Sequence, residues 1–106
     1  MEFINYGKQW LDNDDIAAVT AALQSDFLTQ GPRVGDFEKA LADYMGAKYA
    51  VAVANGTAAL HLAVQALHPE KNWEGITAPN TFVASANCFL YNGFKPGFAD
   101  IDAKTA

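Results

Sequence analysis

The chain has 106 residues, of which 51% are hydrophobic and 18% charged, a composition typical of a folded unit rather than of a disordered segment. Its net charge of −5 and its lack of a basic stripe argue against a nucleic-acid partner. No apolar run is long enough to cross a bilayer. The first residues lack the basic, apolar and small-residue segments that follow one another in a signal peptide. We therefore expect a cytoplasmic protein without a membrane partner.

A first helix is expected after an extended stretch over residues 1–11. Asp12 or Asn13 can cap this helix, which then runs to about residue 25. Helical spacing gives it one apolar face, formed by Ile16, Val19 and Leu23.

A second helix is expected over about 34–45, after a loop that contains Gly31-Pro32. Gly46 is a typical stop for a helix of this kind. The residues predicted to form its buried stripe are Phe37, Leu41 and Tyr44.

From residue 49 onward, strands and helices are expected to alternate. The predicted strands cover 49–53, 76–79 and 98–101, and the predicted helices cover 57 to about 67 and 81 to about 92. Such alternation indicates βαβ units, and so an α/β fold with a parallel sheet covered by helices. The first of these helices has apolar residues on nearly every side, which predicts burial between layers.

The turn Asn55-Gly56-Thr57 has features of an anion-binding site. It joins a predicted strand to a predicted helix, whose free N–H groups and positive dipole end favour an anion. Gly56 lets a ligand approach the backbone closely, and the Thr57 hydroxyl can cap the helix or bond a phosphate oxygen. A plain turn with a helix cap explains the same residues equally well. No Gly-x-Gly-x-x-Gly or P-loop sequence is present.

Phe82, Cys88 and the two histidines are further candidates for a functional role. Phe82 opens a predicted helix and could stack on a planar ring, although a core phenylalanine is the commoner case. Cys88 lies in an apolar helical pattern and is expected to be a plain core cysteine. One cysteine and two histidines give no metal-ligand spacing, so no metal is expected.

The chain resembles, from end to end, the N-terminal part of the DegT–StrS family of pyridoxal-phosphate-dependent sugar aminotransferases. The stretches that carry the resemblance are Leu28-Thr29-Gln30-Gly31-Pro32, Phe37-Glu38, Gly46, 53–62, 78–87, Gly93-Phe94-Lys95-Pro96 and Asp100-Ile101-Asp102. Tyr6, Leu11-Asp12 and residues 28–31 look closest to the branch that aminates C4 of UDP-linked 4-keto-6-deoxy-N-acetylhexosamines for pseudaminic acid.

The resemblance implies a fold type I large domain, with a mixed, mostly parallel sheet and helices on both faces. Residues 1–106 would form one incomplete unit, with an arm and two helices over 1–48 and the start of the cofactor-binding domain over 49–106. It also implies a homodimer. The residues matching cofactor positions, for pyridoxal 5'-phosphate, are Gly56, Thr57 and Phe82. Those matching substrate positions are Tyr6, Asp26, Phe27, Leu28 and Thr29.

The family's catalytic lysine is the main feature without a counterpart. The lysine that forms the Schiff base with the cofactor lies well beyond residue 106 in the family, so no catalytic residue is expected within this chain. None of the six lysines matches that position: Lys8, Lys39, Lys48, Lys71, Lys95 and Lys104. A smaller departure is Asn72-Trp73-Glu74-Gly75, where the family usually has Gly-Asp-Glu-Val.

The function implied is transfer of an amino group, from a donor expected to be glutamate, to a nucleotide-linked 4-keto-6-deoxy sugar for surface polysaccharide or glycan biosynthesis. Two alternatives stay open. Some relatives use the same cofactor to dehydrate a sugar at C3, with a histidine in place of the lysine. A non-catalytic binding module with a vestigial anion site is the other.

Overall fold

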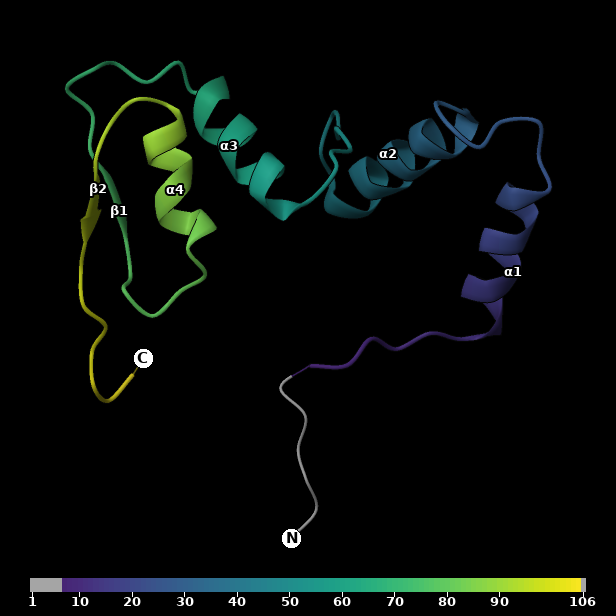
Figure 1. Cartoon of the computed structure of the whole chain (residues 1–106), viewed down its shortest axis with the longest axis horizontal. Helices are drawn as coiled ribbons and strands as arrows, with labels where there is room; N and C mark the ends of the chain where they lie inside the picture. Colours follow the sequence, from purple (N-terminus) through teal and green to yellow (C-terminus); the bar gives the residue numbers. More distant parts are fainter. Residues whose placement is uncertain (1–6, 106) are drawn as a thin grey trace, which may run out of the picture. The chain divides into compact units, whose positions relative to one another are not determined.

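The computed structural model describes residues 7–105 of the chain, which divides into two compact units, Met1–Ala52 and Val53–Ala106. The first unit contains helices α1 (Asn13–Leu23) and α2 (Pro32–Met45). The second contains α3 (Gly56–Ala66), β1 (Gly75–Thr77), α4 (Ala84–Tyr91) and β2 (Pro96–Phe98), coloured from teal to yellow in Figure 1. None of the described helices is long and apolar enough to span a bilayer.

Helix α1 begins at a complete capping box. Its cap is Asp12, one of the two residues predicted for this role. The Asp12 carboxylate accepts hydrogen bonds from the N–H groups of Asp14 (2.9 Å) and Asp15 (3.0 Å). The Asp15 carboxylate in return accepts from the Asp12 N–H at 3.1 Å. Three backbone N–H groups that would otherwise lack an acceptor are thereby satisfied, which fixes where the helix starts.

Helix α2 begins two residues before the predicted position, because Pro32 occupies its first turn. A proline costs nothing there, since the N–H it lacks would have no helical acceptor. The helix ends at Gly46, as predicted, in the left-handed conformation (φ 64°). The Ala47 N–H then donates to the Ala42 carbonyl at 2.9 Å and closes the end.

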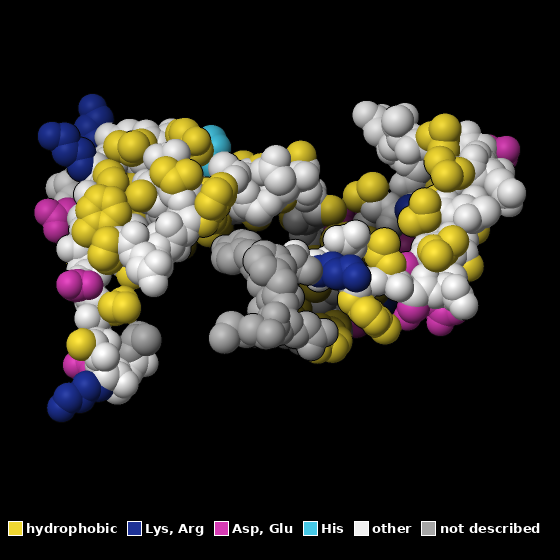
Figure 2. Space-filling model, turned by 60° about the horizontal axis from the view of Figure 1, so that its bottom comes forward, with side chains coloured by type: hydrophobic (Ala, Val, Ile, Leu, Met, Phe, Trp, Pro, Cys, Tyr) yellow, Lys and Arg dark blue, Asp and Glu magenta, His cyan; other side chains and the backbone are white. Residues whose placement is uncertain are grey.

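The predicted buried stripe of α2 is wrong for the described residues. Phe37, Leu41 and Tyr44 are 57%, 38% and 87% exposed, whereas Ala42 is the buried residue of this helix. Periodicity finds an apolar face but not the element that covers it. Within this unit the α2 face that carries Ala42 is covered by the chain that returns after Gly46. Figure 2 shows how many hydrophobic side chains remain at the surface of the protein.

The predicted strand 49–53 has no regular secondary structure and no paired strand among the described residues, so this prediction is wrong for the described structure. Side-chain exposure alternates over residues 49–52, as it does in a strand. Tyr49 and Val51 are 75% and 76% exposed, while Ala50 and Ala52 are half-buried. A strand needs a hydrogen-bonding neighbour, and the described residues give this segment none.

The second unit is built on a parallel pair of strands, as predicted. Gly75, Ile76 and Thr77 of β1 pair with Pro96, Gly97 and Phe98 of β2. Helix α4 connects the two strands and packs on both of them, and α3 packs on α4 (Figure 1). This is the βαβ arrangement that the alternation of elements indicated.

Small side chains on opposite sides of α4 form the core of this unit. Ala84 and Cys88 share one side of the helix and are each 3% exposed, while Ala86, about 200° around the axis, is 8% exposed. The prediction that Cys88 is a core cysteine is confirmed. Asn92 joins the two helices, because its side-chain amide donates to the Cys88 carbonyl (2.8 Å) and to the His61 carbonyl of α3 (3.3 Å).

Three predictions about the second unit are corrected. Helix α4 begins at Ala84 rather than at residue 81, and β2 covers Pro96–Phe98 rather than 98–101. The strand was placed too late because Gly97 contributes no side chain to the alternating pattern. Helix α3 is not buried between layers. One side packs on α4, while Leu60 and Leu62 remain 40% and 45% exposed.

We predict that Gly75→Ala destabilises the protein by about 1–3 kcal/mol, because its new Cβ would overlap the ring of Phe89. Gly75 is buried at the start of β1, and the Phe89 ring is held in place by Phe94, with ring centroids 5.5 Å apart. The free energy of unfolding, from urea titration, measures the effect. Gly97→Ala is the matched control in the paired strand, since its Cβ would lie at an ordinary 3.6 Å from Ile76. Equal losses in both variants would contradict the prediction.

Candidate functional site

The candidate anion site is the first turn of α3, and Asn55 caps it. The Asn55 side-chain oxygen accepts from the Ala58 N–H at 2.9 Å, and its backbone carbonyl accepts from the Ala59 N–H at 3.1 Å. The prediction that the helix begins at Thr57 is therefore corrected, and of the two roles considered for the Thr57 hydroxyl, that of helix cap belongs to Asn55. The helix begins at Gly56, and the sequence signal was available, since asparagine is a better N-cap than threonine.

With Asn55 as the cap, two donors of the turn are left over. Within the described part of the chain, no acceptor is recorded for the N–H groups of Gly56 and Thr57. A Cβ at Gly56 would meet no atom within 4 Å, so the packing of this unit does not itself demand glycine there. The turn thus offers two donors beside open space, where a bound anion could approach the backbone.

The charges around this turn suit an anion, unlike those at the start of α1. Helix α1 has an anionic cap, Asp12, and two more carboxylates in its first turn, Asp14 and Asp15. Helix α3 has a neutral cap and no acidic residue in its first turn. The positive end of its dipole is therefore not neutralised by a charge in its own cap or first turn. A phosphate is the kind of group that such a helix end binds.

Phe82 lies in the loop between β1 and α4, and its side chain is 72% exposed. It precedes α4 instead of lying inside it, and it is not a core residue of the described structure. Helices α3 and α4 pack together, and both begin toward the lower side of the unit as drawn in Figure 1. The loop that carries Phe82 therefore enters α4 at the same end at which Gly56 opens α3.

The predicted substrate residues belong to the other unit. Asp26, Phe27, Leu28 and Thr29 form the exposed loop between α1 and α2, with Phe27 62% and Leu28 69% exposed. The loop is tight. Gln30 has a φ of 54°, and a Cβ at Gly31 would lie 2.8 Å from that of Phe27. Phe27 and Leu28 border a hollow of about 210 Å³ between the two helices. Tyr6 lies outside the described residues.

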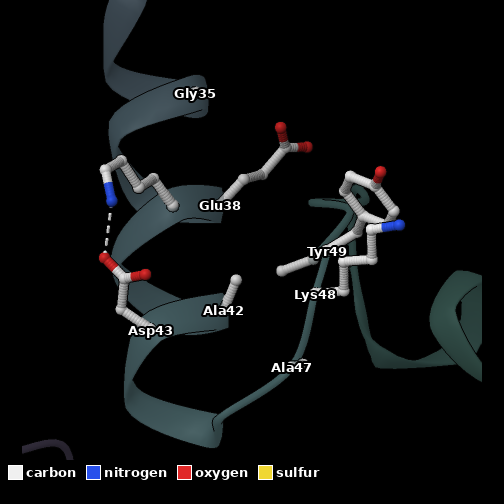
Figure 3. Close-up of a pocket in the computed structure, with 9 residues that line it drawn as sticks. Gly35, Glu38, Ala42, Asp43, Ala47, Lys48 and Tyr49 are labelled. Atoms are coloured by element: carbon white, nitrogen blue, oxygen red, sulfur yellow. Dashed lines mark hydrogen bonds and ion pairs between the residues drawn. The ribbon is translucent and has the colours of Figure 1, made fainter.

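Sequence reasoning missed one polar contact of the first unit. Glu38 of α2 accepts a hydrogen bond from the N–H of Ala52 at 2.8 Å. Figure 3 shows its side chain extending from α2 toward the chain that carries Lys48 and Tyr49. No sequence pattern predicts this bond, because the partner of the Glu38 side chain is a backbone group fourteen positions away. Over the part of the chain that the structure covers, no group of three potential metal ligands is found.

Comparison with known proteins identifies one family. The model of the DegT/DnrJ/EryC1/StrS aminotransferase family matches residues 9–106. The spore coat polysaccharide biosynthesis protein SpsC of Bacillus subtilis is 44% identical over 97% of this chain and 26% of its own length. The UDP-4-amino-4,6-dideoxy-N-acetyl-beta-L-altrosamine transaminase of Campylobacter jejuni is 43% identical over 92% of this chain and 26% of its own length.

Solved structures agree with this result. Helicobacter pylori PseC, an aminotransferase of pseudaminic acid biosynthesis, is 38% identical, with a TM-score of 0.83 over 92% of this chain and 27% of its own. The protein Spr1654 of Streptococcus pneumoniae is 28% identical, with a TM-score of 0.84 over 96% of this chain and 26% of its own. It has been solved in PLP and PMP forms. The chain spans about a quarter of the length of the relatives it matches.

We predict that Asn55→Ala lowers the free energy of unfolding by about 1 kcal/mol, because the Ala58 N–H loses its acceptor. Asn55→Asp should change it by less than about 0.5 kcal/mol, because a carboxylate caps a helix as well as an amide does. Urea titration measures both variants. Asn72→Ala, at an exposed asparagine outside the helices, is the control. An alanine variant as stable as the wild type would show that the cap does not hold the turn.

Proposed function

The chain belongs to the DegT/DnrJ/EryC1/StrS aminotransferase family, and from this we propose that the full-length protein transfers an amino group to a nucleotide-linked keto sugar with pyridoxal 5'-phosphate as cofactor. The observation that carries the proposal is the family match over residues 9–106, together with 43% identity to a named nucleotide-sugar transaminase. Because this chain spans about a quarter of such relatives, the activity is assigned to the longer protein.

The first turn of α3 fits the phosphate of this cofactor. The free N–H groups of Gly56 and Thr57 would donate to phosphate oxygens, and the Thr57 hydroxyl would add a third donor. Asn55 would hold these donors in place without adding a negative charge of its own. When bound, the cofactor supplies the electron sink that amino-group transfer requires, and the protein supplies binding and orientation.

Phe82 would contact the face of the cofactor's pyridine ring. This role agrees with its exposed ring and with its position after the carboxyl end of β1, where ligands bind in open α/β sheets. Asp26, Phe27, Leu28 and Thr29 would contact the nucleotide sugar, together with Tyr6. The support for these five residues is their match to the family's substrate positions, and for Phe27 and Leu28 also their exposure beside a hollow.

The finer parts of the proposal rest on the relatives. We place the acceptor among UDP-linked 4-keto-6-deoxy-N-acetylhexosamines, because one relative is named as a transaminase of a UDP-linked 4-amino-4,6-dideoxy-N-acetyl sugar. PseC, named as an aminotransferase of pseudaminic acid biosynthesis, agrees with this choice. Glutamate as donor, a role in surface polysaccharide or glycan synthesis, a homodimer and a cytoplasmic location complete the proposal. Residues 1–48 would form an arm with two helices and residues 49–106 the start of the cofactor domain. Transaminases among the named relatives favour amination over sugar dehydration.

We expect the full-length protein to retain pyridoxal phosphate through desalting, whereas residues 1–106 alone will not. The chain carries the proposed phosphate turn, but its lysines do not match the family position that bonds the cofactor. The visible absorption spectrum of each desalted protein measures retention. Stoichiometric cofactor on the short chain would show that one of its own lysines bonds the cofactor.

We further expect Gly56→Val in the full-length protein to weaken cofactor binding by about 2 kcal/mol or more, because a side chain would fill the space next to the two free N–H groups. The dissociation constant from a cofactor titration measures this. Gly35→Val is the matched control, since Gly35 is also an exposed helical glycine with open space around it. Unchanged affinity in Gly56→Val would place the phosphate elsewhere.

A further inference from the structure

Glu38 sits at the centre of the contact between α2 and the chain that returns along it. The same face of α2 presents Ala42, one turn later and buried. After Gly46 the chain meets this face again, because Ala50 lines the same hollow as Glu38 and Ala42, and the Ala52 N–H bonds the Glu38 carboxylate. Helix and returning segment border a hollow of about 350 Å³, which is lined in part by Glu38, Ala42 and Tyr49 (Figure 3).

The Glu38 carboxylate bonds a backbone group rather than a neighbouring cation. Lys39, the next residue of the helix, pairs with Asp43 at 2.7 Å, and both of their side chains are exposed. The Glu38 oxygen accepts from the Ala52 N–H at 2.8 Å in a half-buried position. A hydrogen bond to a charged group in such a place is stronger than one between neutral groups.

The position of Ala52 in the sequence gives this bond a role. Segment 49–53 has no regular secondary structure, and no paired strand among the described residues fixes it. Ala52 lies three residues before Asn55, and three residues of extended chain span at most about 10 Å. Whatever holds Ala52 therefore restricts where the backbone enters the turn at Gly56.

We propose that Glu38 is a positioning residue for the phosphate-binding turn, acting through its hydrogen bond to the backbone of Ala52. The inference rests on the proposed function, since it assumes that Gly56 and Thr57 bind the cofactor phosphate. Donors in such a site must be held within about 0.5 Å of their productive positions. Glu38 does not touch the cofactor. It limits the motion of the chain that carries the donors.

The test compares three substitutions in the full-length protein. Glu38→Leu keeps the size of the side chain but removes the acceptor, whereas Glu38→Gln keeps an acceptor oxygen at the same reach. Glu38→Asp keeps the charge but is one methylene shorter, so it serves if Glu38→Leu does not fold. Glu70→Leu, at an exposed glutamate outside α2, is the control.

Two quantities are measured: the dissociation constant for pyridoxal phosphate and the thermal midpoint of the cofactor-free protein. We expect Glu38→Leu to raise the dissociation constant about tenfold or more, the size expected for loss of a charged hydrogen bond, and Glu38→Asp to raise it as well. Glu38→Gln should stay within about threefold of the wild type, and Glu70→Leu should not change it. Lower thermal midpoints with unchanged cofactor affinity would overturn the inference, because they would show a merely structural contact.

Hydrogen exchange at the Ala52 amide separates failure of this inference from failure of the proposed function. Slow exchange at Ala52 in the wild type and in Glu38→Gln, with fast exchange in Glu38→Leu, supports the bond itself. If the wild type shows that bond but binds no pyridoxal phosphate, the proposed function fails and takes the positioning role with it. If Ala52 exchanges fast in the wild type, the positioning role fails and the proposed function is untouched.

Discussion

The packing of α4 between α3 and the strand pair is the contact on which the second unit depends. It is possible because α4 carries small residues, Ala84, Ala86 and Cys88, on both of its buried sides. Small side chains let two neighbours approach one helix closely, and burial of their atoms is the main favourable term holding the unit together. The consequence reaches the candidate site. The loop with Phe82 enters α4 and the turn with Gly56 opens α3, so the α3–α4 contact governs how these two parts are arranged.

Local signals predicted the helices well. Asp12, the Gly31-Pro32 pair and Gly46 act through nearby backbone groups, so the sequence alone shows where α1 begins and where α2 begins and ends, to within two residues. The parallel pairing of β1 with β2 followed from the order of elements. Burial did not follow from the sequence. Phe37, Leu41 and Tyr44 have helical spacing, but what covers a face depends on partners distant in sequence, and the described residues provide none.

The candidate site was predictable in position but not in detail. The family resemblance and the turn-helix part of the predicted pattern both pointed to Gly56 and Thr57, although the strand predicted before the turn is absent from the described residues. The division of labour within the turn was not predicted, because Asn55 and Thr57 can each cap a helix and only the backbone geometry decides between them. The Glu38–Ala52 bond was invisible in the sequence for a different reason. Several backbone N–H groups could have donated to that carboxylate. The turn at Gly46 determines that the Ala52 N–H is the one within reach.

Asn55, the neutral cap of α3, is followed by a glycine and so belongs to the Asn-Gly pairs that are prone to deamidation. In an Asn-Gly pair the glycine backbone nitrogen can attack the carbon of the side-chain amide and expel ammonia, which forms a cyclic imide. Water then opens this imide to aspartate or isoaspartate. At Asn55 the side-chain oxygen is held by the Ala58 N–H, and Gly56 is already in the first turn of a helix, so the groups that would react are restrained. If the turn opens and the reaction occurs, a carboxylate appears beside the two free N–H groups. Ageing of this one residue would then set a negative charge against any phosphate bound there, in a protein whose fold is otherwise intact.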